Sequence, residues 1–340
     1  MSNLERHPTE VVECSTEPTH LISIMQPREV PLGGPRALTV RRTLPSKGRT
    51  MIGAWCFLDH YGPDPVAATG GMRVPPHPHT GLQTVSWLFE GEIEHRDSVG
   101  SHAIVRPGEL NLMTAGRGIS HSEVSTPGTT VLHGAQLWVA LPETERHRMP
   151  SFESHVSKKV RVGDAALQVF VGELAGERAD ASTFSALVAA QVDLSPRGSA
   201  QLPVQPGFEY GVLVDSGEVG IRSSLDENET QVVRHELAHV GTGCTTLTFT
   251  AGPDPARLLL IGGEPLGEKL LMWWNFVGRT HEEIVAYRAA WQAEALGIGG
   301  PPPAGTEDFF TATLPGTTHG FEGGPLPAPE LPTVRLKPRG

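Results

Sequence analysis

Cysteine is scarce in this sequence. The chain has 340 residues and three cysteines, Cys14, Cys56 and Cys244, which are far apart and form no CxxC pair. Disulfide frameworks and cysteine zinc sites depend on several cysteines at short, regular spacings. Neither is therefore indicated, and the expected state of reduced thiols predicts a cytoplasmic protein.

Positive charge is also in short supply. Lys and Arg total 27 against 38 Asp and Glu, which gives a formal net charge of −11, and no Lys/Arg-rich run occurs. A protein that binds DNA or RNA directly needs a basic patch that neutralises phosphates. We therefore expect no direct nucleic-acid binding, and an acidic chain is better suited to contact a basic patch on a protein partner.

Long apolar runs are missing as well. None approaches the roughly 18 residues that predict a membrane-spanning helix. The N-terminal stretch MSNLERHPTEVVECSTEP is polar and has no apolar core, so it does not read as a signal peptide. The sequence predicts neither a membrane span nor export, and residues 1–19 are expected to form a disordered tail.

Glycine and proline, by contrast, are abundant, with 39 and 30 residues, and they favour many turns and short strands. Short segments rich in β-branched and aromatic residues recur in two blocks, 20–145 and 146–297. A polar segment at 143–160 is predicted as the linker between them. At roughly 150 residues per domain, we predict an all-β protein with two domains built as sandwiches or barrels.

One helix is predicted near the end of the second block, in RTHEEIVAYRAAWQAEALG. Thr280 and Glu283 have the spacing of a capping box, and Gly297 ends the pattern. One face of this helix is apolar, formed by Ile284, Tyr287, Ala290 and Trp291. Residues 298–340 are rich in Pro and Gly and predict an extended tail, which either wraps the domain or projects from it.

The stretch PPHPHTG holds the first half of a candidate site. Side chains alternate along a strand, so His77 and His79 point the same way if this segment is extended, and Pro78 favours an extended His77. The stretch MTAGRGISHSE holds His121 and Glu123 at the same spacing, after a glycine turn. Two adjacent antiparallel strands would bring these four side chains together.

Three imidazoles and one carboxylate make a mixed nitrogen and oxygen donor set. This set suits Fe(II) and, less distinctively, Mn, Ni, Cu or Zn. Four protein ligands on an octahedral ion leave two positions for substrate and oxygen. Taken alone, HPH is more often a surface turn and HSE a polar strand edge, but two such pairs in strands that can form a hairpin favour a metal site.

The stretch HELAH, residues 235–239, matches the HExxH pattern of zinc proteases. That pattern requires a helix, because its two histidines must lie one turn apart. A glycine turn and strand-forming residues follow HELAH, so a strand ending at a turn is predicted and the match is interpreted as a coincidence. The second domain holds no HxH pair and is predicted to be metal-free.

Other residues near the site allow two interpretations. His95 is expected to pair with Asp97 across one face of a hairpin rather than to bind a metal. His60 either caps a turn or forms a hydrogen bond in the domain interface. Trp87 and Met113 either belong to the core or line a substrate pocket, and alternation alone does not decide between these.

The segment PPHPHTGLQTVSWLFEGEIEHRDSVG, followed by RPGELNLMTAGRGISHSE, resembles the signature of the pirin family in the cupin superfamily. RRTLPSKGRTMIGAWCFLDHYGPD, WWNFVGRTHEEI and LPAPELPTVRLKPRG resemble further parts of that family. The resemblance implies two cupin barrels (double-stranded β-helix or jelly-roll) packed face to face, and a monomer. It also implies that His77, His79, His121 and Glu123 hold one metal ion, usually iron, in the N-terminal domain.

The resemblance implies two alternative functions. The first is a quercetin 2,3-dioxygenase, in which a flavonol-like substrate and O₂ meet at the metal and Glu123 acts as general base. The alternative is a redox-responsive iron protein that binds a protein partner without turnover. The chain departs from the common cupin pattern at Gln83, where Glu is usual, and this change is expected to alter hydrogen bonds near the ligands rather than the ligands themselves.

Overall fold

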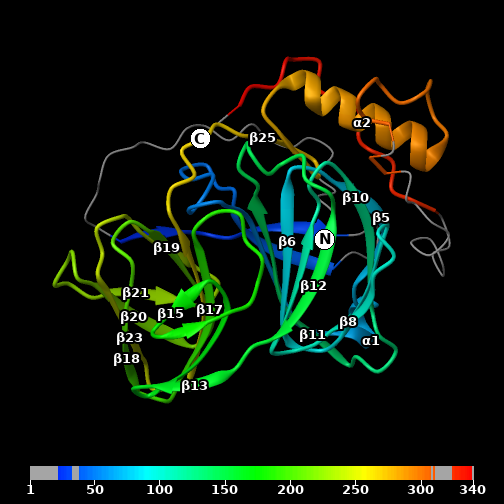
Figure 1. Cartoon of the computed structure of the whole chain (residues 1–340). Coiled ribbons are helices and arrows are strands. Elements are labelled where there is room, and N and C mark those ends of the chain that lie inside the picture. Colours follow the sequence, from blue (N-terminus) through cyan, green and yellow to red (C-terminus); the bar gives the residue numbers. More distant parts are fainter. Residues whose placement is uncertain (1–21, 33–37, 308, 311–323, 339–340) are drawn as a thin grey trace.

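The computed structural model describes residues 22–32, 38–307, 309–310 and 324–338, so the tail predicted at 1–19 lies outside the described residues. Two β-barrels lie side by side, and one long helix lies above the N-terminal barrel (Figure 1). Neither helix in these ranges has the length and apolar character needed to cross a membrane.

The N-terminal barrel consists of a seven-stranded and a four-stranded antiparallel sheet. Its strands are β2 (Arg28–Leu32), β3 (Leu38–Leu44), β4 (Trp55–Pro65), β5 (Arg73–His79), β6 (Leu82–Glu90), β7 (Ile93–Asp97), β8 (His102–Val105), β9 (Glu109–Thr114), β10 (Ile119–Ser125), β11 (Val131–Ala140) and β12 (Ser151–Val156), with the short helix α1 (Val66–Thr69) after β4. The larger sheet has the order β12-β9-β6-β11-β4-β3-β2, and the smaller sheet has the order β5-β10-β7-β8.

The C-terminal barrel has the same plan. Its strands are β1 (Ser23–Met25), β13 (Lys159–Val162), β14 (Ala165–Val171), β17 (Leu187–Leu194), β18 (Ser199–Pro203), β19 (Glu209–Ser216), β20 (Glu218–Ser223), β21 (Thr230–Val233), β22 (Leu237–Val240), β23 (Thr246–Ala251) and β24 (Ala256–Gly263). The seven-stranded sheet has the order β1-β22-β19-β24-β17-β14-β13, and the four-stranded sheet has the order β18-β23-β20-β21. Two hairpins and a helix complete the fold: β15 (Glu173–Leu174) with β16 (Glu177–Arg178), β25 (Leu271–Trp273) with β26 (Phe276–Gly278), and α2 (His281–Leu296).

The two seven-stranded sheets pack against each other. One buried cluster joins Val85, Leu137 and their neighbours in the first domain to Leu213 and Leu259 in the second. Trp87 stacks on Phe170 across this interface, with ring centroids 4.1 Å apart. The prediction of two β-barrels packed face to face is confirmed, and Trp87 belongs to the interface core.

Strand alternation separates two environments within the first seven-stranded sheet. On β11, Leu137 belongs to the interface cluster, whereas Trp138 belongs to a cluster inside the N-terminal barrel. On β6, Trp87 faces the interface, and Ser86 donates a hydrogen bond of 2.8 Å to Gln136 inside the barrel. β6 and β11 therefore contribute to the interface with one face and to the barrel interior with the other.

The chain crosses between the two barrels more often than the predicted linker suggests. Residues 151–156, inside the segment predicted as a linker, form β12 and pair with β9, with Phe152 opposite Met113. The polar composition of 143–160 masked this strand. Phe152 is its aromatic residue, of a type that favours strands. At the other end of the chain, β1 pairs with β22 of the C-terminal barrel, with Ile24 opposite Ala238.

The long helix α2 has the predicted ends and the predicted buried face. The Thr280 hydroxyl accepts a hydrogen bond from the Glu283 backbone N–H, the Glu283 carboxylate accepts one from the Thr280 backbone, and Gly297 ends the helix in the left-handed conformation with φ 63°. The buried residues are Ile284, Tyr287, Ala290 and Trp291. This agrees with a capping box and a glycine C-cap as the local signals that fix both ends of the helix.

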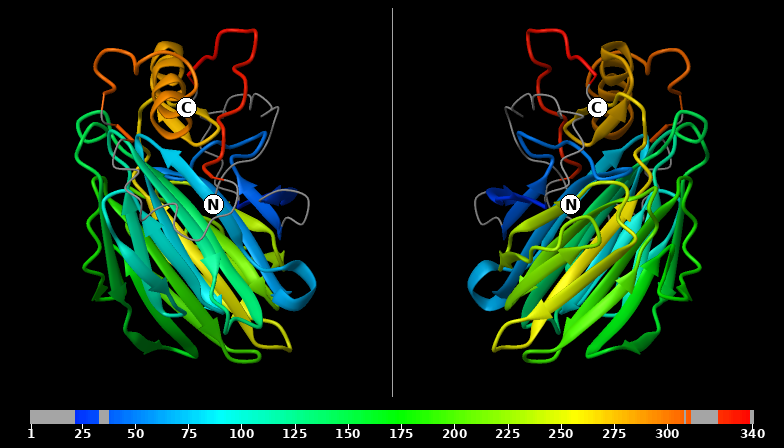
Figure 2. Two further views of the ribbon diagram at one scale, coloured as in Figure 1. Left: turned by 90° about the vertical axis from the view of Figure 1, so that its right-hand side faces the viewer. Right: turned by 90° about the vertical axis from the view of Figure 1, so that its left-hand side faces the viewer.

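In space, the segment that carries α2 covers the N-terminal barrel, although the sequence groups it with the second domain. The Val277 backbone N–H donates to the Thr80 carbonyl at 3.0 Å, directly after His79. Val277 and Leu270 also join the apolar cluster that contains Met113 and Trp138. Figure 2 shows α2 above the ends of the strands in both side views. The apolar side chains of this segment close one end of the barrel.

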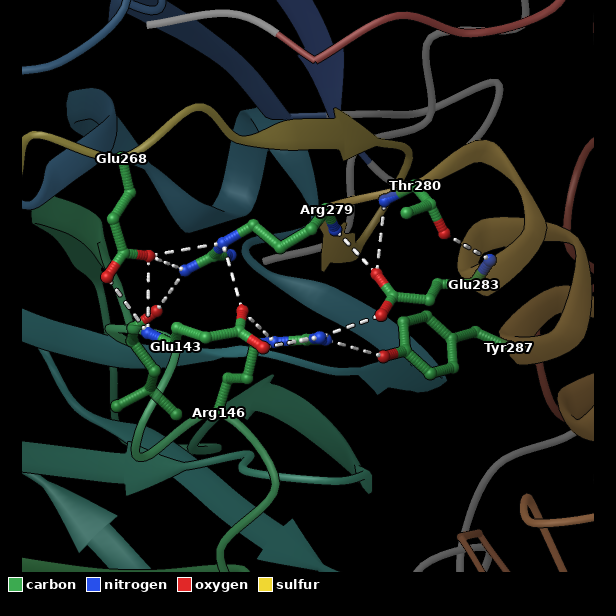
Figure 3. A network of polar contacts seen from close by, with 8 residues as sticks. Glu143, Arg146, Glu268, Arg279, Thr280, Glu283 and Tyr287 are labelled. Carbon is green, nitrogen blue, oxygen red and sulfur yellow. Dashed lines mark hydrogen bonds and ion pairs between the residues drawn. The ribbon is translucent and has the colours of Figure 1, made fainter.

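A network of ion pairs attaches α2 to the loop after β11 (Figure 3). The Arg146 guanidinium donates to Glu143 Oε2 at 2.6 Å and to Glu283 Oε1 at 2.7 Å. Arg279, just before the helix, donates to Glu268 Oε2 at 2.5 Å. Arg146 has only 7% of its side chain exposed, so its two carboxylate partners stabilise a charge that is largely removed from water.

The described part of the C-terminal tail, residues 324–338, lies along α2. The Trp291 indole N–H donates to the Leu326 carbonyl at 2.8 Å, and the Leu326 N–H donates to the Pro76 carbonyl at 2.8 Å. Arg288 donates to the Pro329 carbonyl at 2.5 Å. The tail therefore bridges α2 and the residue that precedes His77.

We expect Arg146→Ala to lower the free energy of unfolding by about 2 kcal/mol, because Glu283 loses a charged donor in a largely buried setting. Urea unfolding measures this loss, and hydrogen exchange should show faster opening of α2. Arg335→Ala is the matched control, since Arg335 and its partner Glu282 are both exposed, and it should change neither readout. Equal effects of the two substitutions would contradict the role of Arg146.

Candidate metal centre

The two predicted motifs lie on neighbouring antiparallel strands, β5 and β10. His121 is directly opposite His77, and Ile119 is opposite His79. The register then shifts between His121 and Glu123, which marks an irregularity in the pairing. Such a bulge redirects side chains locally. The predicted strand arrangement is confirmed, with a bulge that the sequence did not indicate.

Three of the predicted ligands converge inside the N-terminal barrel. The ring centroids of His77 and His121 are 4.4 Å apart, and those of His79 and His121 are 5.0 Å apart. One ring nitrogen from each residue lies within 4.8 Å of the other two. All three side chains are fully buried. We call His77, His79 and His121 the histidine cluster.

Glu123, the fourth predicted ligand, follows His121 by two residues on β10 and is fully buried. Potential ligand atoms of Glu123, His121 and His95 form a second group within 4.8 Å of one another. In the register of β10 and β7, Glu123 is directly opposite His95. His121 thus belongs to both groups, and Glu123 lies beside the histidine cluster.

Hydrogen-bonding atoms in the histidine cluster fit a metal ion. His77 Nδ1 lies 2.8 Å from the Pro75 carbonyl and donates to it, which leaves the lone pair on Nε2. His77 Nε2 is buried without a hydrogen-bond partner among the described residues, and His79 Nε2 lies 3.1 Å from His121 Nε2. Buried polar atoms without partners are costly. A divalent transition metal is a suitable partner for such imidazole nitrogens.

Burial keeps these imidazoles neutral. It lowers the pKa of His77 from its usual value to about 3. Burial also lowers the pKa of His79 and of His121 well below the usual range, and repulsion from a protonated His77 would lower both further. Because only the neutral imidazole offers a lone pair to a metal, the histidine cluster is ready to bind one at neutral pH.

His95 contacts His121 through its Nδ1 atom, and the sequence did not predict this contact. His95 Nδ1 lies 3.4 Å from His121 Nδ1, and His95 Nε2 lies 3.1 Å from Asp97 Oδ2. The ring also stacks on Phe152 with centroids 4.5 Å apart. The expected pairing of His95 with Asp97 is confirmed. The alternation in IEHRD indicates that His95 points inward, since the first, third and fifth residues of this strand are buried.

An aromatic wall lies beside the histidine cluster. Trp138 contacts His79 edge to face, with ring centroids 5.1 Å apart, and stacks on Phe57 at 4.0 Å. Met113 belongs to the same apolar cluster inside the barrel. Several buried polar atoms of the barrel have no hydrogen-bond partner among the described residues: Tyr61 Oη, Asn111 Nδ2 and Oδ1, Gln136 Nε2 and Trp138 Nε1.

The Gln83 side-chain amide donates its hydrogen bonds to groups outside the histidine cluster. Its Nε2 donates to Thr114 Oγ1 and to the Ser182 carbonyl, both at 2.9 Å. The Ser182 contact links the first domain to the loop that precedes β17. The departure from the common cupin pattern therefore contributes to the contact between the domains.

The HELAH stretch is not helical, in agreement with its interpretation as a coincidence. His235 lies in a turn with φ 75°, and His239 lies on β22. His239 Nε2 is 2.9 Å from Glu209 Oε2. His60, for which the sequence left two interpretations, forms an interdomain hydrogen bond of 2.7 Å with Asp215.

Two family models match this chain. One, described as Pirin, matches residues 37–139, and the other, described as Pirin C-terminal cupin domain, matches residues 189–297. The first model contains all four predicted ligands. The two matches correspond to the two barrels of the structure.

Individual relatives extend over most of the chain. A Pseudomonas aeruginosa protein named "Putative quercetin 2,3-dioxygenase PA1205" is 41% identical, over 82% of this chain and 86% of its own length. A pirin-like protein of Caulobacter vibrioides is 35% identical, over 75% of this chain and 88% of its own length. A crystal structure titled as quercetin 2,3-dioxygenase from Acinetobacter baumannii superimposes with a TM-score of 0.80 at 34% identity, and the match covers 93% of this chain and 97% of that one.

We expect the stability of the metal-free protein to fall as the pH drops from 7 to 5. The histidines of the cluster stay neutral when folded, with the pKa of His77 at about 3, whereas in the unfolded chain they bind protons below about pH 6.5. Each then contributes a slope of about 1.4 kcal/mol per pH unit, with stability rising with pH. Urea unfolding in the presence of a chelator should give His77→Gln a shallower slope than the wild type. Equal slopes would refute this expectation.

We expect His95→Ala to weaken metal binding by about 10- to 100-fold, because it removes the group that orients His121. Competition with a chelating dye measures this affinity. His102→Ala is the matched control, since His102 is exposed on the neighbouring strand and bonds to Glu94. Unchanged affinity in the His95 variant would show that His121 needs no such support.

Proposed function

This chain belongs to the pirin family, and we propose that it is a metal-dependent dioxygenase that opens the heterocycle of a flavonol such as quercetin with O₂. One observation carries the proposal. Three neutral imidazoles converge in a closed barrel, next to a buried carboxylate and an aromatic wall. The relatives and solved structure whose names refer to quercetin 2,3-dioxygenase support the choice of substrate.

We propose iron(II) as the ion, held by His77, His79, His121 and Glu123. A bound iron ion would supply a Lewis acid that lowers the pKa of a substrate hydroxyl, and it would provide redox chemistry toward O₂. The donor set of the histidine cluster suits iron among the first-row metals. The buried His77 Nε2, which has no hydrogen-bond partner among the described residues, and the facing Nε2 atoms of His79 and His121 support retention of such an ion.

Glu123 is the proposed acceptor of the substrate's hydroxyl proton. Its side chain is fully buried, and Ser86 Oγ lies 3.5 Å from Glu123 Oε1 while it donates to Gln136 Oε1 at 2.8 Å. A general base in this position contributes about 100- to 10,000-fold to a rate.

The barrel interior suits a flat, hydroxylated molecule. Trp138 and Phe57 form a stacked pair against which an aromatic ring system can lie. Tyr61 Oη and Trp138 Nε1 have no partner among the described residues and would bind the substrate's oxygen atoms. The segment before α2 closes one end of the barrel, and this would limit access of water to the reaction.

The iron-loaded protein is expected to consume quercetin and O₂, and to release one CO per flavonol opened. Loss of the flavonol absorbance under air measures turnover. His79→Ala should abolish turnover and metal retention together. Glu123→Gln should reduce the rate by about 100-fold or more, and His102→Ala should leave it unchanged. Absence of turnover above the level of His79→Ala, in protein that holds stoichiometric iron, would refute the dioxygenase proposal.

A further inference from the structure

A second cluster of metal-ligating side chains lies between the two domains. His60 on β4 and His133 on β11 come from the N-terminal barrel, and Asp215 on β19 comes from the C-terminal barrel. The Nε2 atoms of both histidines approach the same oxygen, Asp215 Oδ1, at 2.7 and 2.5 Å. All three side chains are buried. They face the interface, on the opposite side of the sheet from the histidine cluster.

A fourth histidine is held beside this group in an unusual backbone conformation. His235 has φ 75°, a region that residues with a Cβ seldom adopt. Its ring centroid lies 5.2 Å from that of His60. His60 Nδ1 and His235 Nδ1 are both buried without a hydrogen-bond partner among the described residues. Backbone strain of this kind persists where the surrounding structure enforces it, and it is concentrated at functional sites.

We propose that His60, His133 and Asp215 form a second metal site, which binds a divalent transition metal of the zinc type and clamps the two domains together. His235 is the candidate for a fourth ligand. This site is separate from the proposed function, because its residues belong to the interface and do not touch the barrel interior.

The geometry needs only a small adjustment to accept an ion. Zinc binds imidazole nitrogen and carboxylate oxygen at about 2.0–2.2 Å, so tetrahedral ligand atoms lie about 3.3 Å apart. The observed separations of 2.5 and 2.7 Å require an opening of about 0.6–0.8 Å.

The arginines around Asp215 indicate which class of ion the site can bind. Arg257 donates to Asp215 Oδ2 at 3.2 Å, which leaves Oδ1 to the histidines. Arg234 donates to the Asp215 backbone carbonyl at 3.0 Å, and the charge of Arg41 acts on both His60 and His235. The arginines thus engage Asp215 Oδ2 and the Asp215 carbonyl, which leaves too few oxygen ligands for Mg²⁺ or Ca²⁺. Two imidazoles and one carboxylate oxygen suit an ion of the zinc type.

The test separates the two sites by disabling the first. A His79→Ala/His121→Ala variant removes two members of the histidine cluster and leaves the interface intact. After chelation and equilibration with Zn²⁺, we expect about one zinc ion per chain by mass spectrometry of the metal content. Adding His133→Gln should reduce the content to about zero, whereas adding His155→Gln should leave it unchanged. His155 is the matched control, because it pairs with Glu153 on the surface.

Co²⁺ gives a readout that does not depend on the folding of any interface variant. In the His79→Ala/His121→Ala protein, intense visible bands of four-coordinate Co²⁺ would support the site, and the weak spectrum of hydrated Co²⁺ would overturn it. Absence of zinc from this protein would equally show that the cluster serves only as a hydrogen-bonded contact between the domains. Either result is independent of quercetin turnover, so failure of one proposal does not entail failure of the other.

Discussion

The face-to-face packing of the two seven-stranded sheets is the constraint on which the rest of the structure depends. It buries both faces of central strands such as β6 and β11 in the N-terminal member of this pair, one against the other domain and one inside a barrel. Strand alternation then sorts neighbouring residues into different environments. His60 and His133 face the interface, whereas Gln136 and Trp138 face the barrel interior. The interface histidines and the histidine cluster can therefore belong to the same barrel without sharing a site.

Burial of imidazole is the physical feature that the two groups share. A neutral imidazole in an apolar surrounding needs a partner for each ring nitrogen, and the two groups meet that need differently. At the interface, Asp215 accepts from two histidines and is itself held by Arg257. Inside the barrel, His79 Nε2 and His121 Nε2 face each other at 3.1 Å, and His77 Nε2 has no hydrogen-bond partner among the described residues. The second arrangement is the one that most requires an ion, and we place the proposed chemistry there.

Closure of the barrel depends on a segment from the far end of the chain. Leu270, just before β25, and Val277 on β26 join the barrel cluster, and ion pairs around Arg146 hold α2 in place (Figure 3). The tail then contacts Pro76, next to the first histidine of the HPH motif. The C-terminal segment therefore acts as part of the N-terminal domain, and it connects the stability of the helix to the surroundings of the proposed metal site.

Local patterns in the sequence were sufficient for the features whose causes are local. The capping box at Thr280, the stop at Gly297 and the two-residue spacing of His77 with His79 each depend on residues within a few positions, and the structure has all three. The pairing of β12 with β9, the support of His121 by His95 and the meeting of His60 with Asp215 across 155 positions did not follow from such patterns. Alternation specifies which residues share a face, because it is a property of one strand. Which face becomes interior, and which distant side chain it meets, is decided by register and by the packing of whole sheets.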